Sequence, residues 1–363
     1  MFTLLFSLFI SLIMVKLILF TNDVHYHLSH DHDLVGVQKY HQIPVPRVGG
    51  MAIFVAFLLS TLLINNMGSE WSRFISGVAV SVFFIFLGGI TEDLTKDFGP
   101  FKRVAFMSLG TFIAIFAVNV LPVIYNLGIP SVDSQLKTYF FTCLLLTVLL
   151  VVGVTNSFNL IDGYHGISSF CGMIGLITIA VIAYKLGCIE VYYTSLTMVG
   201  AILGFFIYNY PRGKLFLGDG GAYLIGFSIA VLGIYLSQKY HDKFKPLSLL
   251  LIVSYPVIEV LFTIYRRRLV KKVHAMRPDQ MHLHQLIYHR CLPLSLGNKR
   301  NCRVLPRILP FIVPQSLLAI FFNNQFYIVV IGLILSVFIY IYSYIALIKF
   351  RTPWWLFSRK NKQ

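Results

Sequence analysis

The chain carries little charge. Only 12% of its 363 residues are Asp, Glu, Lys or Arg, which is about half of the roughly 25% found in soluble domains. By contrast, 57% are hydrophobic and the mean hydropathy is +0.77. This composition excludes an ordinary soluble domain and predicts a protein embedded in a membrane. The five cysteines show no Cys-x-x-Cys spacing, which argues against a zinc or disulfide framework. Because no repeat or low-complexity linker is present, we expect residues 1–363 to form a single domain.

Long apolar segments fill most of the chain. A membrane-spanning helix needs about 20 mostly apolar residues, so we expect an all-α, polytopic bundle of about 11 transmembrane helices. Their approximate limits are 2–20, 49–65, 77–91, 104–123, 138–156, 168–184, 192–209, 221–237, 247–265, 306–323 and 325–348. The first segment lacks a small-residue cleavage site, so we interpret it as an anchor rather than a signal peptide.

The positive charges fall mostly on one side of these spans. Of the 30 Lys and Arg residues, 23 lie in or next to the loops on one side and 6 on the other. Cytoplasmic loops are enriched in Lys and Arg, so we expect this side to be cytoplasmic, with the N-terminus outside and the C-terminus inside. This bias, with attraction to anionic membrane lipid, explains the formal charge of +16 without a nucleic-acid partner.

Four polar motifs interrupt the apolar chain, and two expected spans separate each motif from the next. They are Gly89 to Asp93, Asn156 to Gly163, Phe216 to Gly221, and His282 to His284. This parity puts all four on the side expected to be cytoplasmic. The loops that would form the catalytic face are 21–48, 92–103, 157–167, 210–220 and 266–305. Polar residues at membrane depth usually mark function, so we expect a membrane enzyme.

Asp219 is the first candidate for a metal site. The neighbouring glycines leave room for its carboxylate to approach a metal–phosphate ligand, and Mg²⁺ prefers a few hard oxygen ligands completed by phosphate and water. The alternative role is that of a helix N-cap. Phe216, three residues earlier, could stack on a nucleobase or pack against lipid or core.

Glu92 and Asp93 end another span. Adjacent carboxylates near lipid repel each other unless they share a cation or a proton. One of them could activate a nucleophile while the other holds a metal or its water. The alternative is a pair of solvated acids at a helix end.

Asn156, Asn159 and Asp162 fall at i, i+3 and i+6, close to one face of a helix. Amides and a carboxylate so placed at the end of a span predict a hydrogen-bonding pocket. His165 follows between two glycines, Gly163 and Gly166, which let the chain bend.

Basic and imidazole groups suited to phosphate occur in the first and last of these loops. Arg47 ends a Pro-x-Pro-Arg stretch and offers a forked cation. His282 and His284, with Arg277, could bind a diphosphate by charge and hydrogen bonds. Zinc binding is the weaker alternative, because convincing third and fourth ligands are lacking although His289 is near.

Two further features stand apart from these motifs. The loop 21–48 also contains four histidines, which we interpret as a hydrated His-rich loop in preference to a metal cluster. They are His25, His27, His30 and His32. Glu259 lies inside an expected span, and we expect it to pair with Arg266 or Arg267, one to two helical turns on.

Taken together and in order, the motifs from Pro44 to His284 resemble those of the polyprenyl-phosphate N-acetylhexosamine-1-phosphate transferases. This membrane superfamily includes phospho-MurNAc-pentapeptide translocase. The Asn-x-x-Asn-x-x-Asp-Gly and Phe-x-Gly-Asp-x-Gly elements are specific in combination. The Pro-x-Pro-Arg-x-Gly-Gly stretch looks more like the branch that initiates O-antigen and related surface glycans.

The resemblance implies transfer of a sugar 1-phosphate from a UDP-N-acetylhexosamine to undecaprenyl phosphate, with release of UMP, at the cytoplasmic face of a bacterial inner membrane. It implies Mg²⁺, or Mn²⁺ in its place, held by Asp219 and Asp93. It also implies catalytic roles for Glu92, Asp93, Asp162 and Asp219, and substrate binding by Arg47, Asn156, Asn159, His165, Phe216, Arg277, His282 and His284. A homodimer stays open.

The chain departs from the family pattern at three positions. Glu92 stands where an Asp is usual, Gln285 replaces a third histidine, and His165 replaces an Asn or Asp. We interpret these departures as signs of an unusual donor sugar or, less readily, of a weakened enzyme.

Alternative functions are a transferase of the peptidoglycan translocase type, a flippase for lipid-linked sugars and a lipid-binding scaffold. Transporters place polar residues near the bilayer midplane, whereas the acids here cluster at span ends, so we favour an enzyme. A scaffold would keep its function after Asp219→Asn. We expect direct attack of the lipid phosphate on the β-phosphorus, assisted by Asp93; a covalent aspartyl route stays open.

Overall fold

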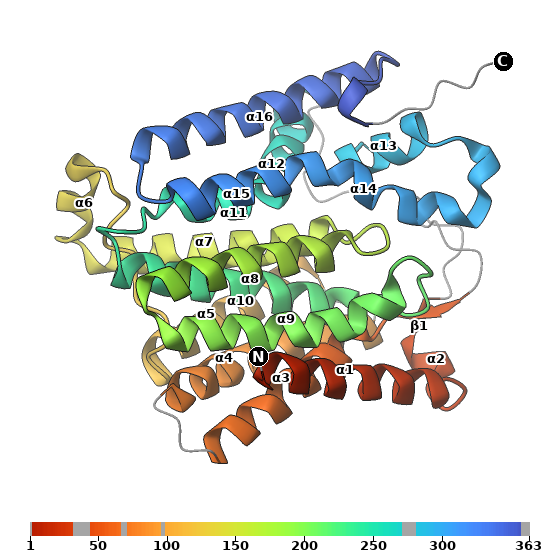
Figure 1. The fold of residues 1–363 in the computed structure, drawn as a ribbon, viewed down its shortest axis with the longest axis horizontal. Helices are drawn as coiled ribbons and strands as arrows, with labels where there is room; N and C mark the ends of the chain where they lie inside the picture. Colours follow the sequence, from red (N-terminus) through yellow and green to blue (C-terminus); the bar gives the residue numbers. More distant parts are fainter. Residues whose placement is uncertain (1, 32–43, 67–70, 96–98, 271–280, 357–363) are drawn as a thin grey trace.

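The computed structural model describes residues 2–31, 44–66, 71–95, 99–270 and 281–356 and is built almost entirely of helices (Figure 1). In chain order the first half contains α1 (Phe2–Phe20), α2 (Tyr26–Ser29), β1 (His30–Asp31), β2 (Val45–Pro46), α3 (Gly49–Asn66), α4 (Ser72–Thr95), α5 (Pro100–Phe112), η1 (Ile113–Ala117), α6 (Pro130–Leu136), α7 (Phe140–Leu160) and α8 (Ile167–Leu186). The second half contains α9 (Ile189–Asn209), α10 (Gly218–Lys239), α11 (Leu247–Ile252), α12 (Ser254–Tyr265), η2 (Arg266–Val270), α13 (Leu283–Cys291), η3 (Leu294–Arg303), α14 (Leu305–Ile308), η4 (Leu309–Phe311), α15 (Val313–Phe322), α16 (Phe326–Ile348) and η5 (Trp354–Leu356).

The expected all-α membrane bundle is confirmed. Within the described ranges, 10 helices are long and apolar enough to cross a membrane. The segment 247–265, expected as one further span, is instead two helices, α11 and α12, that meet at Val253. Pro256 explains the break, because a proline has no N–H to donate to the carbonyl four residues earlier, that of Ile252.

Helix α10 is the centre of the bundle. Buried residues make up 94% of its apolar window but only 28% of that of α1, so α10 is enclosed by protein while α1 leaves much of its surface exposed on the outside of the bundle. Helices α3, α4, α7 and α8 all pack against α10. Glycines let them approach closely: a Cβ on Gly226 of α10 would lie 2.8 Å from Thr155 Cα of α7.

The ends of several helices meet on the right-hand side of Figure 1, near β1 and α13. A Cβ on Gly50 of α3 would lie 2.3 Å from the backbone nitrogen of Gly221, and one on Gly89 of α4 would lie 2.4 Å from Gly220 Cα. The helices α3, α4 and α10 therefore meet backbone to backbone, which fixes the polar motifs at their ends relative to each other.

The strands β1 and β2 form a two-residue antiparallel ribbon in the first loop. The Arg47 N–H donates to Ser29 O at 2.8 Å, and His25 Nδ1 lies 2.6 Å from Ser29 Oγ. The His-rich segment thus holds the backbone that leads into Arg47. No cluster of three or more potential metal ligands occurs in the described part of the chain; His32 lies outside it.

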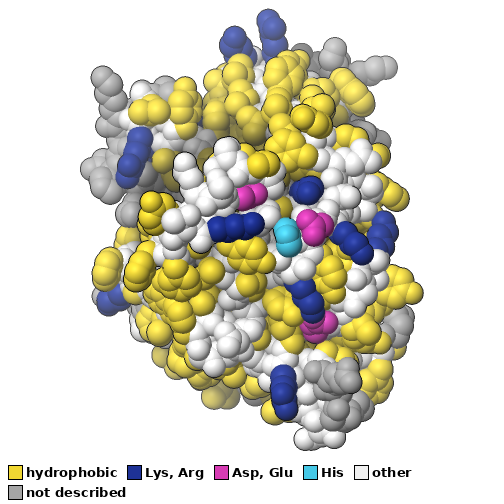
Figure 2. Space-filling model, turned by 90° about the vertical axis from the view of Figure 1, so that its left-hand side faces the viewer, with side chains coloured by type: hydrophobic (Ala, Val, Ile, Leu, Met, Phe, Trp, Pro, Cys, Tyr) yellow, Lys and Arg dark blue, Asp and Glu magenta, His cyan; other side chains and the backbone are white. Residues whose placement is uncertain are grey.

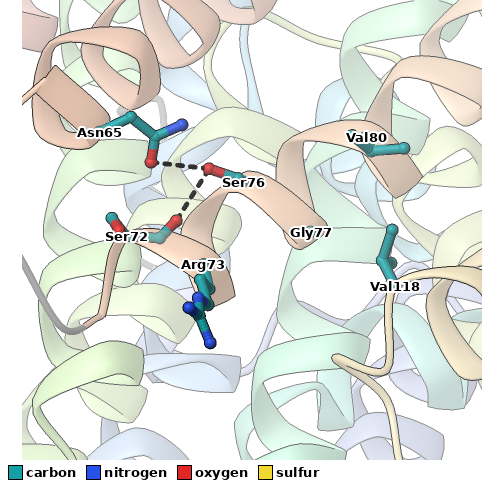
Figure 3. A pocket seen from close by; sticks show the side chains of 7 residues that line it. All are labelled: Asn65, Ser72, Arg73, Ser76, Gly77, Val80 and Val118. Carbon is teal, nitrogen blue, oxygen red and sulfur yellow. Dashed lines mark hydrogen bonds between the residues drawn. The ribbon is translucent and has the colours of Figure 1, made fainter. Parts of the chain in front are cut away.

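At the opposite end of the bundle, hydrophobic side chains surround a group of Lys, Arg, Asp, Glu and His side chains near the middle of the face (Figure 2). This end contains a cavity of about 470 Å³ lined by Asn65, Ser72, Arg73, Ser76, Gly77, Val80 and Val118 (Figure 3). Ser76 and Asp93 lie 17 residues apart on α4, or about 26 Å at 1.5 Å per residue. This cavity is therefore separate from the polar motifs.

Candidate active site

Three motifs converge on Asp219, in the first turn of α10. Asp219 Oδ1 accepts a hydrogen bond from Arg47 Nη2 at 2.7 Å and another from Asn159 Nδ2 at 2.6 Å. Asp219 is 8% exposed, and the Arg47 side chain is 37% exposed. Charge-assisted bonds of this length are the strong ones, so the Asp219 carboxylate is held in a fixed orientation at the edge of the protein.

Asp93 caps the helix that carries Asp219. Its Oδ1 accepts from the Asp219 N–H at 2.8 Å, and its Oδ2 accepts from the Gly220 N–H at 3.0 Å. These are amides that a helix leaves unpaired at its N-terminus, where a negative charge is also favoured by the helix dipole. Gly218 has φ +76°, and a Cβ there would lie 2.5 Å from Asp93 Oδ2. The N-cap role considered for Asp219 therefore belongs to Asp93.

Glu92 points to different neighbours from Asp93. Its Oε2 accepts from the Tyr223 hydroxyl at 3.0 Å, and its Oε1 forms an ion pair with the Arg103 guanidinium. The sequence reasoning missed both partners. Tyr223 lies four residues after Asp219, one helical turn on, and this spacing is the one sequence signal that points to Tyr223 as a residue of the site. Arg103 contributed to the sequence analysis only through the count of Lys and Arg residues on the side expected to be cytoplasmic.

Of the polar residues near the end of α7, only Asn159 contacts Asp219. Helix α7 ends at Leu160, so Asp162 lies in the following turn and not on the helix face expected from its spacing. Asn156 makes no side-chain hydrogen bond within the described residues. Burial raises the pKa of Asp162 to about 7; Arg47 opposes this shift and Asp219 adds to it.

Phe216 and His165 bring two partly exposed rings together, with centroids 5.9 Å apart and planes inclined by 37°. The backbone of Phe216 is fixed to the loop before Arg47, because its N–H donates to Pro46 O and its carbonyl accepts from the Gly49 N–H, both at 2.9 Å. The His165 N–H donates to Asn301 Oδ1 at 2.8 Å. Such a pair of rings can offer a stacking surface to a flat base.

The loop histidines begin α13, and both are buried. Their rings are parallel within 3°, with centroids 5.4 Å apart. Glu259 of α12 is the acid that they face: His282 Nδ1 lies 3.1 Å from its Oε1, and His284 Nδ1 lies 3.9 Å from its Oε2. The expected pairing of Glu259 with Arg266 or Arg267 is therefore wrong, because the broken span turns Glu259 toward α13. Arg277 lies outside the described residues.

Comparison with known proteins places this geometry in a family. The model of glycosyl transferase family 4 matches residues 75–237. A Bacillus subtilis protein, named as a probable undecaprenyl-phosphate N-acetylglucosaminyl 1-phosphate transferase, is 30% identical over 268 residues, which are 74% of this chain and 71% of the relative. The chain belongs to glycosyl transferase family 4.

Two other relatives cover similar lengths. A decaprenyl-phosphate N-acetylglucosaminephosphotransferase of Mycobacterium tuberculosis is 30% identical over 315 residues, which are 78% of this chain and 74% of the relative. A phospho-N-acetylmuramoyl-pentapeptide-transferase of Streptococcus thermophilus is 28% identical over 253 residues, which are 66% of this chain and 73% of the relative. The chain is thus a multi-pass membrane transferase rather than a transporter or a scaffold.

The acidic groups of this family 4 transferase suit a hard divalent cation. The four carboxylates of the site are Glu92, Asp93, Asp162 and Asp219, and the two guanidinium groups beside them are Arg47 and Arg103. With all four ionised, two negative charges are uncompensated. Within the described residues no three ligand groups converge on one point. That donor set fits Mg²⁺, which commonly takes one or two carboxylates and completes its shell with phosphate and water.

Proposed function

We propose that this protein transfers an N-acetylhexosamine 1-phosphate from a UDP-sugar to undecaprenyl phosphate, giving the lipid diphosphate sugar and UMP. The observation that carries the proposal is the convergence of Arg47, Asn159 and Asp93, from three separate motifs, on the helix turn that holds Asp219. Family membership supports the same reaction.

The chemistry needs positioning more than it needs a strong base. A phosphate monoester has a second pKa near 6, so the lipid phosphate is already largely dianionic at neutral pH. Its oxygen forms a bond to the β-phosphorus as the bond to the UMP oxygen breaks. Such reactions are accelerated mainly by alignment and by neutralising the phosphate oxygens. Both Asp93 oxygens are occupied by backbone amides, so we assign Asp93 to positioning Asp219 rather than to proton removal.

We assign a different part of the substrate to each group of residues around Asp219. Asp219 is the protein ligand proposed for Mg²⁺, which supplies neutralisation of the diphosphate charge when bound. Arg47, half-exposed beside it, is placed to bind phosphate oxygens. Phe216 and His165 are proposed to hold the uracil, and His282 and His284 the diphosphate side of the donor.

We place this site at the cytoplasmic face of a bacterial inner membrane. The excess of Lys and Arg on the side of the motifs supports that orientation, and UDP-sugars are made in the cytoplasm. The proposed role is the first step of a surface polysaccharide such as O-antigen. The similarity to a phospho-N-acetylmuramoyl-pentapeptide-transferase keeps a muramoyl-peptide donor as the second candidate.

The test is UMP release by purified protein with undecaprenyl phosphate, Mg²⁺ and a panel of donors. The panel contains UDP-N-acetylglucosamine, UDP-N-acetylgalactosamine and UDP-N-acetylmuramoyl-pentapeptide. We expect lipid-dependent release with an N-acetylhexosamine donor and near-complete loss in Asp219→Asn. The matched control is Asp242→Asn, which neutralises a highly exposed carboxylate remote from the site in sequence. Release that persists in Asp219→Asn, or release only with the muramoyl-peptide donor, would overturn this assignment.

A further inference from the structure

A polar cavity lies at the end of the bundle opposite the candidate active site, and the proposed reaction does not use it. It is formed where α3 ends and α4 begins, and Val118, in the loop after η1, lines its other side (Figure 3). Gly77 lets this loop approach α4, because a Cβ on Gly77 would lie 2.4 Å from Val120 Cγ1. The volume of about 470 Å³ is within the roughly 300–1,000 Å³ of small-molecule pockets, so the cavity is large enough for a ligand.

Arg73 supplies the charge of this cavity. It is exposed and forms no hydrogen bond or ion pair with the described residues, so its N–H donors are open to a ligand. The hydroxyl of Ser72, beside it, has no partner among those residues either. Within the described ranges no Asp or Glu lines the cavity, and Glu70 lies outside them. A guanidinium and a hydroxyl without a lining acid favour an anion, and the fork of an arginine matches the oxygens of a phosphate.

The polar part of the cavity is held in shape by Ser76. Its hydroxyl lies 2.9 Å from Asn65 Oδ1 and 2.8 Å from Ser72 O (Figure 3). These contacts join the end of α3 to the first turn of α4, so the residues around Arg73 are in place before a ligand binds. A preformed site loses less conformational freedom on binding.

Aromatic contacts on both sides of Arg73 indicate its depth in the membrane. Trp71 stacks on Tyr193 of α9, with centroids 4.7 Å apart and planes inclined by 17°. Phe74 packs against Tyr235 of α10, with centroids 4.5 Å apart. Trp and Tyr are enriched where the lipid tails meet the headgroups. We therefore place Arg73 at the level of the lipid headgroups.

An exposed apolar face of α4 begins at the cavity. Ser76, Val80 and Phe83 follow Arg73 at spacings of three and four residues, so all four share one face of the helix. Val80 is 44% exposed and Phe83 is 40% exposed. On the other side of the cavity, the 57% exposed Phe116 of η1 comes shortly before the loop that lines it. A cation thus lies at one end of a surface that suits a hydrocarbon chain.

We propose that this cavity binds the phosphate of an anionic phospholipid from the leaflet at this end of the bundle. Arg73 pairs with the phosphate oxygens, the Ser72 hydroxyl donates to one of them, and an acyl chain lies along Val80. Phosphatidylglycerol is preferred to phosphatidylethanolamine, because no acid among the described lining residues is present to pair with an ammonium group. The bound lipid joins the ends of α3 and α4, so it stabilises the folded bundle. The site does not depend on the proposed transfer reaction.

Native mass spectrometry of the delipidated protein in detergent, titrated with phosphatidylglycerol, measures the tightest lipid-binding step. Arg73→Gln should weaken this step by about 5- to 10-fold, because each cation at headgroup depth contributes about a factor of five, whereas Arg73→Lys keeps the charge and should retain most of the affinity. The matched control is Lys137→Gln, which removes an exposed cation at the same end of the bundle and should bind like the wild type. Unchanged binding in Arg73→Gln, an equal loss in Lys137→Gln, or equal affinity for phosphatidylethanolamine would overturn the proposal.

Ser72→Asp separates loss of binding from loss of folding. Ser72 begins α4, and an acid in the first turn of a helix is favoured by the helix dipole, so the lipid-free variant should unfold at or above the temperature of the wild type. The new charge repels a phosphate, and we expect phosphatidylglycerol to bind about 10-fold or more weakly, since like charges brought together in an interface are costly. Lipid binding that stays at the wild-type level in Ser72→Asp would contradict a phosphate site beside Ser72.

Inorganic phosphate distinguishes the lipid from a free anion. The unfolding temperature of the delipidated wild type should rise with phosphatidylglycerol and stay unchanged with inorganic phosphate, because only the lipid also contacts the apolar face of α4. In Arg73→Gln the rise with phosphatidylglycerol should be smaller. A rise with inorganic phosphate as large as with the lipid, and lost in Arg73→Gln, would overturn the assignment to a phospholipid.

Discussion

Replacing Asp93 by asparagine tests whether Asp93 holds the start of α10 in place or takes part in the reaction itself. In the wild type both Asp93 oxygens accept backbone N–H groups at the start of α10. Asparagine keeps one acceptor and replaces the other with a donor, so one buried N–H loses a charged partner, which costs about 1.5–3 kcal/mol. Loss of the charge beside the helix dipole adds about 0.3–1 kcal/mol. Together the first turn of α10 should be destabilised by roughly 2–4 kcal/mol.

Amide hydrogen exchange measured by mass spectrometry reads this local stability. A change of 2–4 kcal/mol corresponds to exchange about 30- to 1,000-fold faster in the first turn of α10. The control is Asp219→Asn, in which both amide bonds to Asp93 remain, so exchange there should stay close to the wild type while UMP release is lost. Unchanged exchange in Asp93→Asn, or equally fast exchange in both variants, would show that Asp93 does not hold the helix.

Three further predictions concern packing, base binding and pH. Gly89→Ala should yield little folded protein, because its Cβ would lie 2.4 Å from Gly220 Cα, whereas Gly153→Ala has nothing within 4 Å and should be recovered normally; gel filtration in detergent compares them. Phe216→Leu should raise KM for the UDP-sugar by about 5- to 150-fold, the equivalent of the 1–3 kcal/mol of one base stacking contact. Mg²⁺ affinity, measured by titration calorimetry, should fall between pH 8 and pH 6, because Asp162, with a pKa of about 7, gains a proton there and removes a negative charge.

Each of these predictions has a contrary outcome. Equal recovery of the two glycine variants would show that α4 and α10 are not in close contact. An unchanged KM in Phe216→Leu would assign that ring to lipid or core packing. If Mg²⁺ affinity in Asp162→Asn still fell with decreasing pH as in the wild type, another group would be responsible for the pH dependence.

The spans were predictable because lipid imposes a simple rule: the backbone must be satisfied internally and the side chains must be apolar over about 20 residues. The rule fails at 247–265, where composition is mostly apolar but Pro256 prevents a continuous helix. That proline was visible in the sequence, yet hydropathy takes no account of a missing N–H.

Contacts in the site were less predictable, because they join residues far apart in the chain. Asp93 and the amide that it caps are 126 residues apart, and no local pattern distinguishes a cap for another helix from a metal ligand. Glu259 was expected to use helical spacing to reach Arg266, whereas its partner His282 is 23 residues away. The motifs indicate which residue types meet; only the packing of α3, α4 and α10 decides which atoms do.

The glutamate at position 92 is compatible with this packing. Neighbouring residues on a helix point about 100° apart, so the acids at the end of α4 face different surroundings. Asp93, with the shorter side chain, reaches the amides of α10, while Glu92 reaches Tyr223 and Arg103. The longer side chain of Glu92 therefore lets its carboxylate reach partners different from those of Asp93. Because Asp93 accepts both amide bonds at the start of α10, a glutamate in place of aspartate at position 92 leaves the cap of the turn that carries Asp219 unchanged.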